Sequence, residues 1–230
     1  LLSKVKINYF INKYDLKIND EIIKIYNDFL PDIVIIIKGH KILESTLVHM
    51  NNSKLILWMM DSVERVPKVF ETIELYDFVY VFEEKDVNYL RNKGVFSRHL
   101  PLALDKKLYN FNKDCIEKLY DITFIGSLYQ ERIDILKKII DKYPSKNILI
   151  KGFFPSWKTA LLNTDLIFGK YKKYFSLESV KEGEVSKIYS RSKVVLNLHQ
   201  NFAPSGTNLR FFEIAGTKSV QIVNNKSFID

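Results

Sequence analysis

ITFIGS, at residues 122–127, is the stretch that decides the fold, because a short run rich in apolar and β-branched residues leads directly into a glycine and a serine. Continuous apolar runs of this length are typical of parallel strands that are buried on both faces of a sheet. Such runs, rich in β-branched residues, recur along the chain and predict further strands at residues 33–37, 55–59, 78–82, 148–150, 194–198 and 219–223.

Amphipathic stretches with recognisable ends separate these runs. A helix is expected over residues 21–30, with Asn19 or Asp20 as its cap and Pro31 as its stop. A second, over residues 86–92, should end at Gly94. The alternation of strands and helices predicts an α/β fold with mainly parallel sheets. A further helix over residues 131–142 should bury one face, made of Ile135, Leu136, Ile139 and Ile140.

The chain is expected to form two Rossmann-like lobes, residues 1–104 and 105–230. Residues 101–120 show no clean period and form the predicted linker. The chain starts with leucine and stops soon after a strand. We therefore expect both lobes to be trimmed, with a strand–helix unit before residue 1 and helices after residue 230.

Composition restricts the function. The net charge of +8 favours anionic partners such as nucleotide diphosphates, nucleic acid or a membrane surface. The lysines are dispersed, however, and no basic stripe is interleaved with aromatic residues, so nucleic-acid binding is not expected. Peripheral membrane contact stays open. The single cysteine, Cys115, excludes an intramolecular disulfide and a cysteine metal cluster, and fits a cytoplasmic protein.

Polar residues or glycines follow several predicted strands, where open α/β sheets bind their ligands. In the first lobe these are His40 and Asp61. In the second lobe they are Gly126, Ser127, Lys151 and His199.

The segment SGTNLRFFE, at residues 205–213, predicts a helix that Ser205 or Thr207 caps and that starts near Asn208. The free N–H groups at such a helix start suit a diphosphate, and Arg210 adds donors for its oxygens. Glu213 is placed to accept the hydroxyls of a ribose. An alternative remains open, in which Arg210 and Glu213, three residues apart, pair only with each other.

The segments YDITFIGSLYQER (120–132), VSKIYSRSKVVLNLH (185–199) and SGTNLRFFEIAG (205–216) resemble the GT-B glycosyltransferases of the group 1 superfamily. The branch typified by the spore-maturation CgeB proteins is the most similar, and the first lobe follows its order with PDIVIII, LILWMMDSVE and HLPLALD. The resemblance implies two lobes that face each other across a cleft. It also implies a nucleotide-diphosphate-sugar donor and an acceptor that is a glycan, a protein or a lipid-linked molecule.

By the same resemblance, several residues contact the donor. Glu213 matches the ribose-binding glutamate, and Thr207, Asn208 and Arg210 match the diphosphate-facing turn. Gly126 and Ser127 match the loop beside the phosphates, which Arg132 follows.

Metal-independent chemistry is expected, with no cofactor. The sequence has no Asp-x-Asp motif, and its four histidines do not stand at metal-ligand spacing. Charge on the leaving diphosphate would then be stabilised by Arg210, Arg132 or Lys151 and by the helix start. His40 and Asp61 are the candidates for a general base, although a loop histidine and a helix cap are the alternative interpretations. His199 either touches the donor sugar or is a loop histidine.

Three other function classes are compatible with these features. A nucleotide-sugar epimerase shares the architecture and would convert the donor without an acceptor. A two-lobed nucleotide-sugar-binding protein without chemistry is the second alternative. A nucleic-acid-binding module is the third, and it rests on charge alone.

Overall fold

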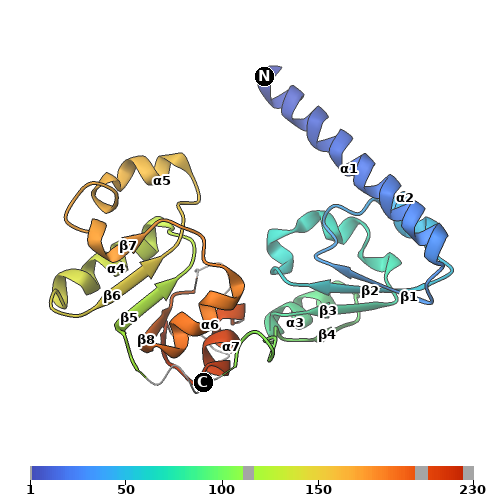
Figure 1. Ribbon diagram of the computed structural model, residues 1–230. Coiled ribbons are helices and arrows are strands. Elements are labelled where there is room, and N and C mark those ends of the chain that lie inside the picture. The colour runs from blue at the N-terminus through green and yellow to red at the C-terminus, as the bar shows by residue number, and fades with distance from the viewer. Residues whose placement is uncertain (1, 111–116, 200–206, 225–230) are drawn as a thin grey trace. The chain divides into compact units, whose positions relative to one another are not determined.

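A computed structural model describes residues 2–110, 117–199 and 207–224, and Figure 1 shows its helices and strands. The chain divides after Pro101 into two compact units, here called unit 1 and unit 2. The sequence prediction puts this boundary after residue 104. Each unit has its own parallel sheet and its own buried core. Cys115 and Ser205, on which two sequence predictions rest, lie outside the described residues.

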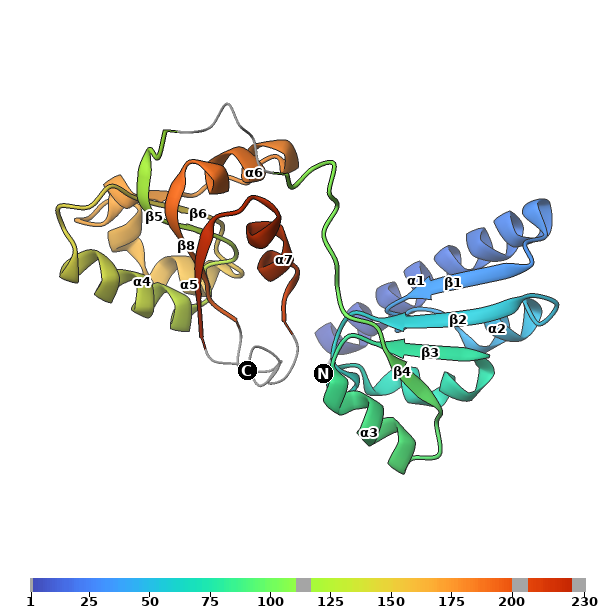
Figure 2. The ribbon, with the colours of Figure 1, turned by 90° about the horizontal axis from the view of Figure 1, so that it is seen from below.

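Unit 1 carries four parallel strands in the order β1-β2-β3-β4, which run side by side in Figure 2. Because the chain crosses this sheet in one direction and parallel crossovers are right-handed, the connecting segments fall on one face. One buried cluster accordingly joins Tyr26, Leu47 and Leu90, from the three helices, to Leu57 of the sheet. The strands are β1 (Ile33–Ile37), β2 (Lys54–Met59), β3 (Phe78–Val81) and β4 (Ser97–His99). The helices are α1 (Leu2–Phe29), α2 (Glu44–His49) and α3 (Glu84–Asn92), with 3-10 helices at Val63–Arg65, Pro67–Glu71 and Ile73–Leu75.

The opposite face of the unit 1 sheet corrects the prediction that the strands are buried on both sides. β1 is an edge strand, and Ile33, Ile35 and Ile37 each remain more than half exposed, at 56%, 63% and 55%. The described helices of this unit pack on the other side of the sheet. An apolar strand sequence therefore does not by itself show that both faces are covered.

Unit 2 carries five parallel strands in the order β7-β6-β5-β8-β9. The chain moves outward from β5 to β7 and then returns to the other side of β5, so its helices cover both faces. Phe124 belongs to one buried cluster, with Leu136 of α4, and Ile125 to another, with Ile214 of α7. The strands are β5 (Tyr120–Ile125), β6 (Ile148–Lys151), β7 (Phe175–Ser176), β8 (Ser192–Asn197) and β9 (Val220–Val223). The helices are α4 (Gln130–Lys142), α5 (Trp157–Leu162), α6 (Glu182–Ser190) and α7 (Leu209–Gly216), with 3-10 helices at Thr164–Leu166 and Lys172–Tyr174.

The predicted helix cap at Asn19 or Asp20 is wrong, because both residues lie inside α1. Asn19 is buried, and its amide donates to the carbonyls of Asp15 (2.7 Å) and Lys41 (2.9 Å). Its oxygen accepts the N–H of Leu43 at 2.9 Å. A residue type that favours caps here ties a helix to the loop after β1.

Two other helix ends lie where the sequence predicts them. α1 stops at Phe29, ahead of Pro31, and Gly94 after α3 has a φ of +81°, as predicted. On α4, by contrast, Ile135 is exposed and Ile133 is fully buried, so the buried face is rotated from the predicted one. Across the described chain, no helix is both long enough and apolar enough to cross a bilayer.

Candidate functional site

Unit 2 contains a pocket of about 200 Å³ at the carboxyl ends of β5 and β8. These neighbouring strands mark the point where the chain reverses its direction across the sheet, which is where open α/β sheets bind ligands. The sequence-predicted site residues that line it are Gly126, Ser127, Arg132, Asn208 and Arg210. The fold thus brings together side chains that lie more than 80 positions apart in the sequence.

The loop that carries Gly126 and Ser127 along the pocket lies very close to the backbone that follows β6. Gly126 and Ser127 follow β5, and Gly152 follows β6. A Cβ atom at Gly152 would lie 2.0 Å from the carbonyl oxygen of Gly126, a distance that no side chain tolerates. A glycine at position 152 is therefore required for the loop that carries Gly126 to hold its present path.

Arg132, in the first turn of α4, is held by backbone oxygens. Its Nη1 donates to the carbonyl of Ser127 (3.0 Å) and its Nη2 to that of Leu198 (2.6 Å). Its buried Nε has no hydrogen-bond partner among the described residues. Burial lowers the pKa of Arg132 from its ordinary value, and the nearby charge of Arg210 lowers it further. Within the described chain, this guanidinium forms no ion pair.

Arg210 and Glu213 form an ion pair on α7, with 2.6 Å between Nη1 and Oε2. Glu213 is buried and is not one of the residues that line the pocket. Burial lowers the pKa of Arg210, but Tyr189 and Glu213 raise it by more, so the net shift is upward. The pairing that the spacing allowed is therefore present in this structure. Two arginines share the pocket, and the carboxylate of Glu213 engages one of them.

The start of α7 is fixed by Asn208, not by the predicted cap Thr207, which is buried. The Asn208 oxygen accepts the N–H of Phe211 (3.1 Å), and its amide donates to Asn197 (2.8 Å). Its backbone N–H donates to Nε2 of His199 at 3.1 Å. Capping leaves other N–H groups of the first turn without partners inside the helix, so they can meet an anion.

Two of the other predicted site residues, His199 and Lys151, lie outside the pocket and contact other parts of the fold. His199 is buried two residues after the end of β8, where its Nε2 accepts from Asn208 and its Nδ1 lies 3.3 Å from Oδ1 of Asn224. Lys151 is the last residue of β6 and pairs in register with Ile125. Neither of them lines the 200 Å³ pocket. The interpretation of His199 as a loop histidine fits these contacts.

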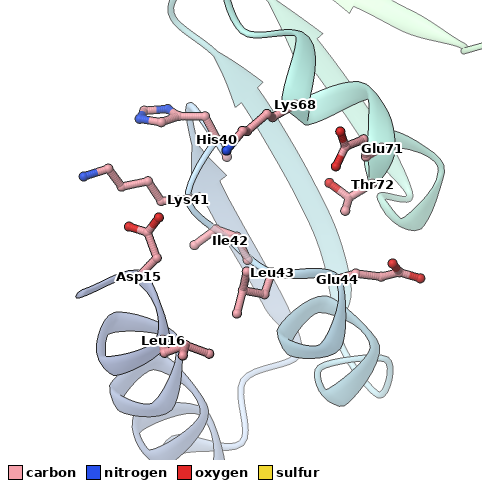
Figure 3. Close-up of a pocket in the computed structure, with 11 residues that line it drawn as sticks. Asp15, Leu16, His40, Lys41, Ile42, Leu43, Glu44, Lys68, Glu71 and Thr72 are labelled. Carbon is pink, nitrogen blue, oxygen red and sulfur yellow. The ribbon is translucent and has the colours of Figure 1, made fainter. Parts of the chain in front are cut away.

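In unit 1, His40 lines a separate pocket of about 460 Å³ beyond the carboxyl end of β1. Figure 3 shows its walls, which come from α1, the loop after β1, the start of α2 and the 3-10 helix at Pro67–Glu71. Asp61 does not line this pocket. Its carboxylate lies 3.1 Å from Lys38 Nζ and 3.3 Å from Arg65 Nη1. Of the two candidates for the general base, His40 therefore lines a pocket, whereas Asp61 forms ion pairs and does not line that pocket.

Sequence reasoning missed two polar residues of the unit 2 pocket. Asn197, the last residue of β8, lines it and bonds to the cap Asn208. A polar residue inside the apolar run VVLNL was the available signal. Tyr189, from α6, also lines it, and burial raises its pKa. Nothing in the local sequence marked this tyrosine. Among the described residues, no group of three or more His, Cys, Asp or Glu side chains is placed to hold a metal ion.

Residues 122–230, which are less than half of the chain, match the family described as glycosyl transferase-like. No curated protein has a sequence that matches the chain significantly. Solved structures do match, and they show that the chain has the α/β fold of the GT-B glycosyltransferases, with two parallel sheets.

Three of these structures illustrate the likeness. The first is described as trehalose-6-phosphate from E. coli bound with UDP-2-fluoro glucose, with a TM-score of 0.63 at 15% identity over 91% of this chain and 62% of that chain. An α,α-trehalose-phosphate synthase (UDP-forming) from Burkholderia vietnamiensis has a TM-score of 0.59 at 10% identity, over 94% and 63%. A putative UDP-N-acetylglucosamine 2-epimerase from Listeria monocytogenes has a TM-score of 0.56 at 10% identity, over 93% and 62%. The chain therefore spans less than two thirds of the length of each of these three structures.

Proposed function

We propose that the chain is part of a glycosyltransferase that moves a sugar from a nucleotide-diphosphate-sugar to an acceptor. The observation that carries this proposal is the unit 2 pocket, where Arg132, Arg210 and the start of α7 meet at the switch point of the sheet. The family match over residues 122–230 supports it. On the motifs FIGS, SKVVLNLH and GTNLRFFE, we assign the chain to the CgeB-like branch.

In this proposal the diphosphate leaves without help from a metal ion. Negative charge develops on the leaving diphosphate, and preorganised donors aimed at it lower the barrier. Arg132 and Arg210 supply two guanidinium groups, and α7 supplies N–H groups and the positive end of its dipole. The lack of an Asp-x-Asp motif in the sequence is the second support. Reaction in the cytoplasm is part of the same proposal, and cell fractionation tests it.

We propose His40, and not Asp61, as the general base toward the acceptor. His40 lines a pocket whose volume of about 460 Å³ lies within the usual range for small-ligand sites. The carboxylate of Asp61 already forms ion pairs with Lys38 and Arg65. Rates of sugar transfer by His40→Ala and Asp61→Asn variants distinguish the two, since only the first should lose the chemical step.

We expect Glu213→Ala to weaken nucleoside diphosphate binding roughly 10- to 100-fold, because charge-assisted hydrogen bonds are worth about 1.5–3 kcal/mol. Two roles give this result. Glu213 either holds the ribose directly or positions Arg210 through their 2.6 Å contact. Affinity for a 2′,3′-dideoxyribose analogue separates the roles. If Glu213 holds the ribose, the parent discriminates against the analogue and the variant does not.

Glu131→Ala is the matched control for Glu213→Ala, because Glu131 is an exposed glutamate on α4 of the same unit. Its variant should keep the parent affinity. Equal discrimination against the dideoxy analogue by the parent and by Glu213→Ala would end the ribose assignment. It would leave Glu213 as the residue that positions Arg210.

A nucleotide-sugar epimerase is the second candidate function. The similarity to a structure described as a putative UDP-N-acetylglucosamine 2-epimerase favours it. An epimerase would convert the nucleotide-sugar without any acceptor, so NMR of the donor incubated with the protein alone identifies this activity. Binding with neither conversion nor transfer would instead indicate a nucleotide-sugar-binding protein without chemistry.

A further inference from the structure

The helix α5 is unusual because its sequence, WKTALL, is mostly apolar and yet none of its residues is buried. Trp157 is 71% exposed, Leu161 66% and Leu162 76%. Phe168, just after the following 3-10 helix, is 82% exposed. These four side chains are here called the α5 patch. Figure 1 shows α5 at the margin of unit 2, beyond β6 and β7. Large apolar side chains gathered in this way mark an interaction surface.

The backbone that carries the α5 patch is anchored. Asn163 is buried, and its amide donates to Oε1 of Gln130 (2.7 Å) while its oxygen accepts from Nζ of Lys137 (3.1 Å). Leu166 is buried in the core of the unit. The Ser156 hydroxyl caps the start of α5 by accepting the N–H of Thr159. The outward direction of the patch is therefore fixed by the fold of unit 2.

The segment of the chain that carries the α5 patch is rich in lysine. Lys158, Lys172 and Lys173 are exposed, and the Lys158 ammonium lies 6.0 Å from the ring centre of Trp157. Asp165 is the sole acidic residue between positions 153 and 173, and Lys137 already neutralises it at 2.8 Å. Exposed tryptophan and leucine side chains in a segment with exposed lysines are the combination that binds the interface of an anionic bilayer.

We propose that the α5 patch docks unit 2 onto an anionic lipid surface. The apolar side chains enter the boundary between headgroups and acyl chains, and the three lysines meet the lipid phosphates. Lysine suits this place because its alkyl stem lies along the apolar layer while its ammonium stays in water. This inference goes beyond the proposed function and does not depend on it.

Co-sedimentation with vesicles tests the docking surface. We expect the chain to bind vesicles of phosphatidylcholine with phosphatidylglycerol, and to bind pure phosphatidylcholine vesicles several-fold more weakly, since each lysine near an anionic surface contributes about a fivefold gain. The Leu161→Ser, Leu162→Ser double variant should lose at least about tenfold in partitioning, because two large apolar side chains no longer enter the lipid. Its fold should be preserved, since α5 buries no side chain.

Ile35→Thr is the matched control, because Ile35 is exposed to a similar degree (63%) but lies on the sheet of unit 1. It should bind vesicles as the parent does. A Trp58→Phe variant leaves Trp157 as the sole tryptophan, whose emission should shift to the blue on anionic vesicles. The proposal is overturned if the parent binds neither kind of vesicle. That result is the one expected if the α5 patch binds a protein partner instead of lipid. The proposal is also overturned if the leucine variant binds like the parent. Nucleotide titration of the leucine variant checks the donor site separately and should be unchanged.

Discussion

Replacing Arg132 and Arg210 together by glutamine is expected to weaken nucleoside diphosphate binding about 100-fold or more. Both guanidinium groups line the 200 Å³ pocket, and each hydrogen bond from such a group to phosphate is worth about 1.5–3 kcal/mol. Each single variant should lose roughly 10- to 100-fold by the conversion of about 1.4 kcal/mol per decade. Calorimetric titration with a nucleoside diphosphate measures all three variants.

The two arginine losses are not expected to add. Arg132 and Arg210 are close enough for the charge of one to lower the pKa of the other, and neighbouring sites couple. Removing one cation relieves repulsion on the other, so the double loss should be smaller than the product of the single losses. Lys138→Gln on the exposed side of α4 controls for net charge and should bind as the parent does. If the double variant binds nucleoside diphosphate within threefold of the parent affinity, a difference of about 0.7 kcal/mol, the assignment of the two arginines to the diphosphate site is wrong.

Gly152→Ala is expected to destabilise unit 2 by about 3 kcal/mol or more, because overpacking against rigid backbone lies at the costly end of such substitutions. The new Cβ atom would lie 2.0 Å from the backbone oxygen of Gly126 and 3.3 Å from Leu128. The ends of β5 and β6 must separate to admit it. Urea unfolding followed by circular dichroism measures the change in the free energy of unfolding.

Gly183→Ala is the control for Gly152→Ala, since a Cβ atom at position 183 meets nothing within 4 Å. Gly183 lies in α6, where alanine should stabilise the helix by about 0.5–1 kcal/mol. The two glycine substitutions should therefore have opposite signs. A Gly152→Ala variant as stable as the parent would show that the loops after β5 and β6 can separate freely.

The α/β class and the parallel strands could be predicted because apolar runs such as ITFIGS carry their own signal. β7 was missed because two residues, Phe175 and Ser176, are too few for a pattern. The helix cap at Asn19 failed because a long-range contact with the loop after β1 outweighed its local preference. One face of β1 is packed and the other is exposed because of the order in which the strands and helices are connected. A run of isoleucines does not encode that order.

The site was predictable where residues follow strands or open a helix. Gly126, Ser127 and Asn208 lie in such places, and they do line one pocket. Spacing could not decide whether Arg210 pairs with Glu213, because that depends on the rotamers and burial of both. It also could not show that Tyr189, from another helix, completes the wall. Convergence of distant segments belongs to the tertiary fold.

Titration of the unmodified chain with UDP-, GDP-, dTDP- and CMP-sugars in EDTA, followed by thermal unfolding and calorimetry, tests the central claim most directly. We predict that at least one of them binds and raises the stability of the chain, by about 2.7 kcal/mol at 100 times its Kd. The affinity should stay within tenfold when Mg²⁺ or Mn²⁺ replaces EDTA, because in our proposal Arg132 and Arg210, which line the pocket, and the start of α7 meet the diphosphate in place of a metal ion. Failure of all four to bind, or binding only with a divalent ion, would contradict a metal-independent nucleotide-sugar site in unit 2.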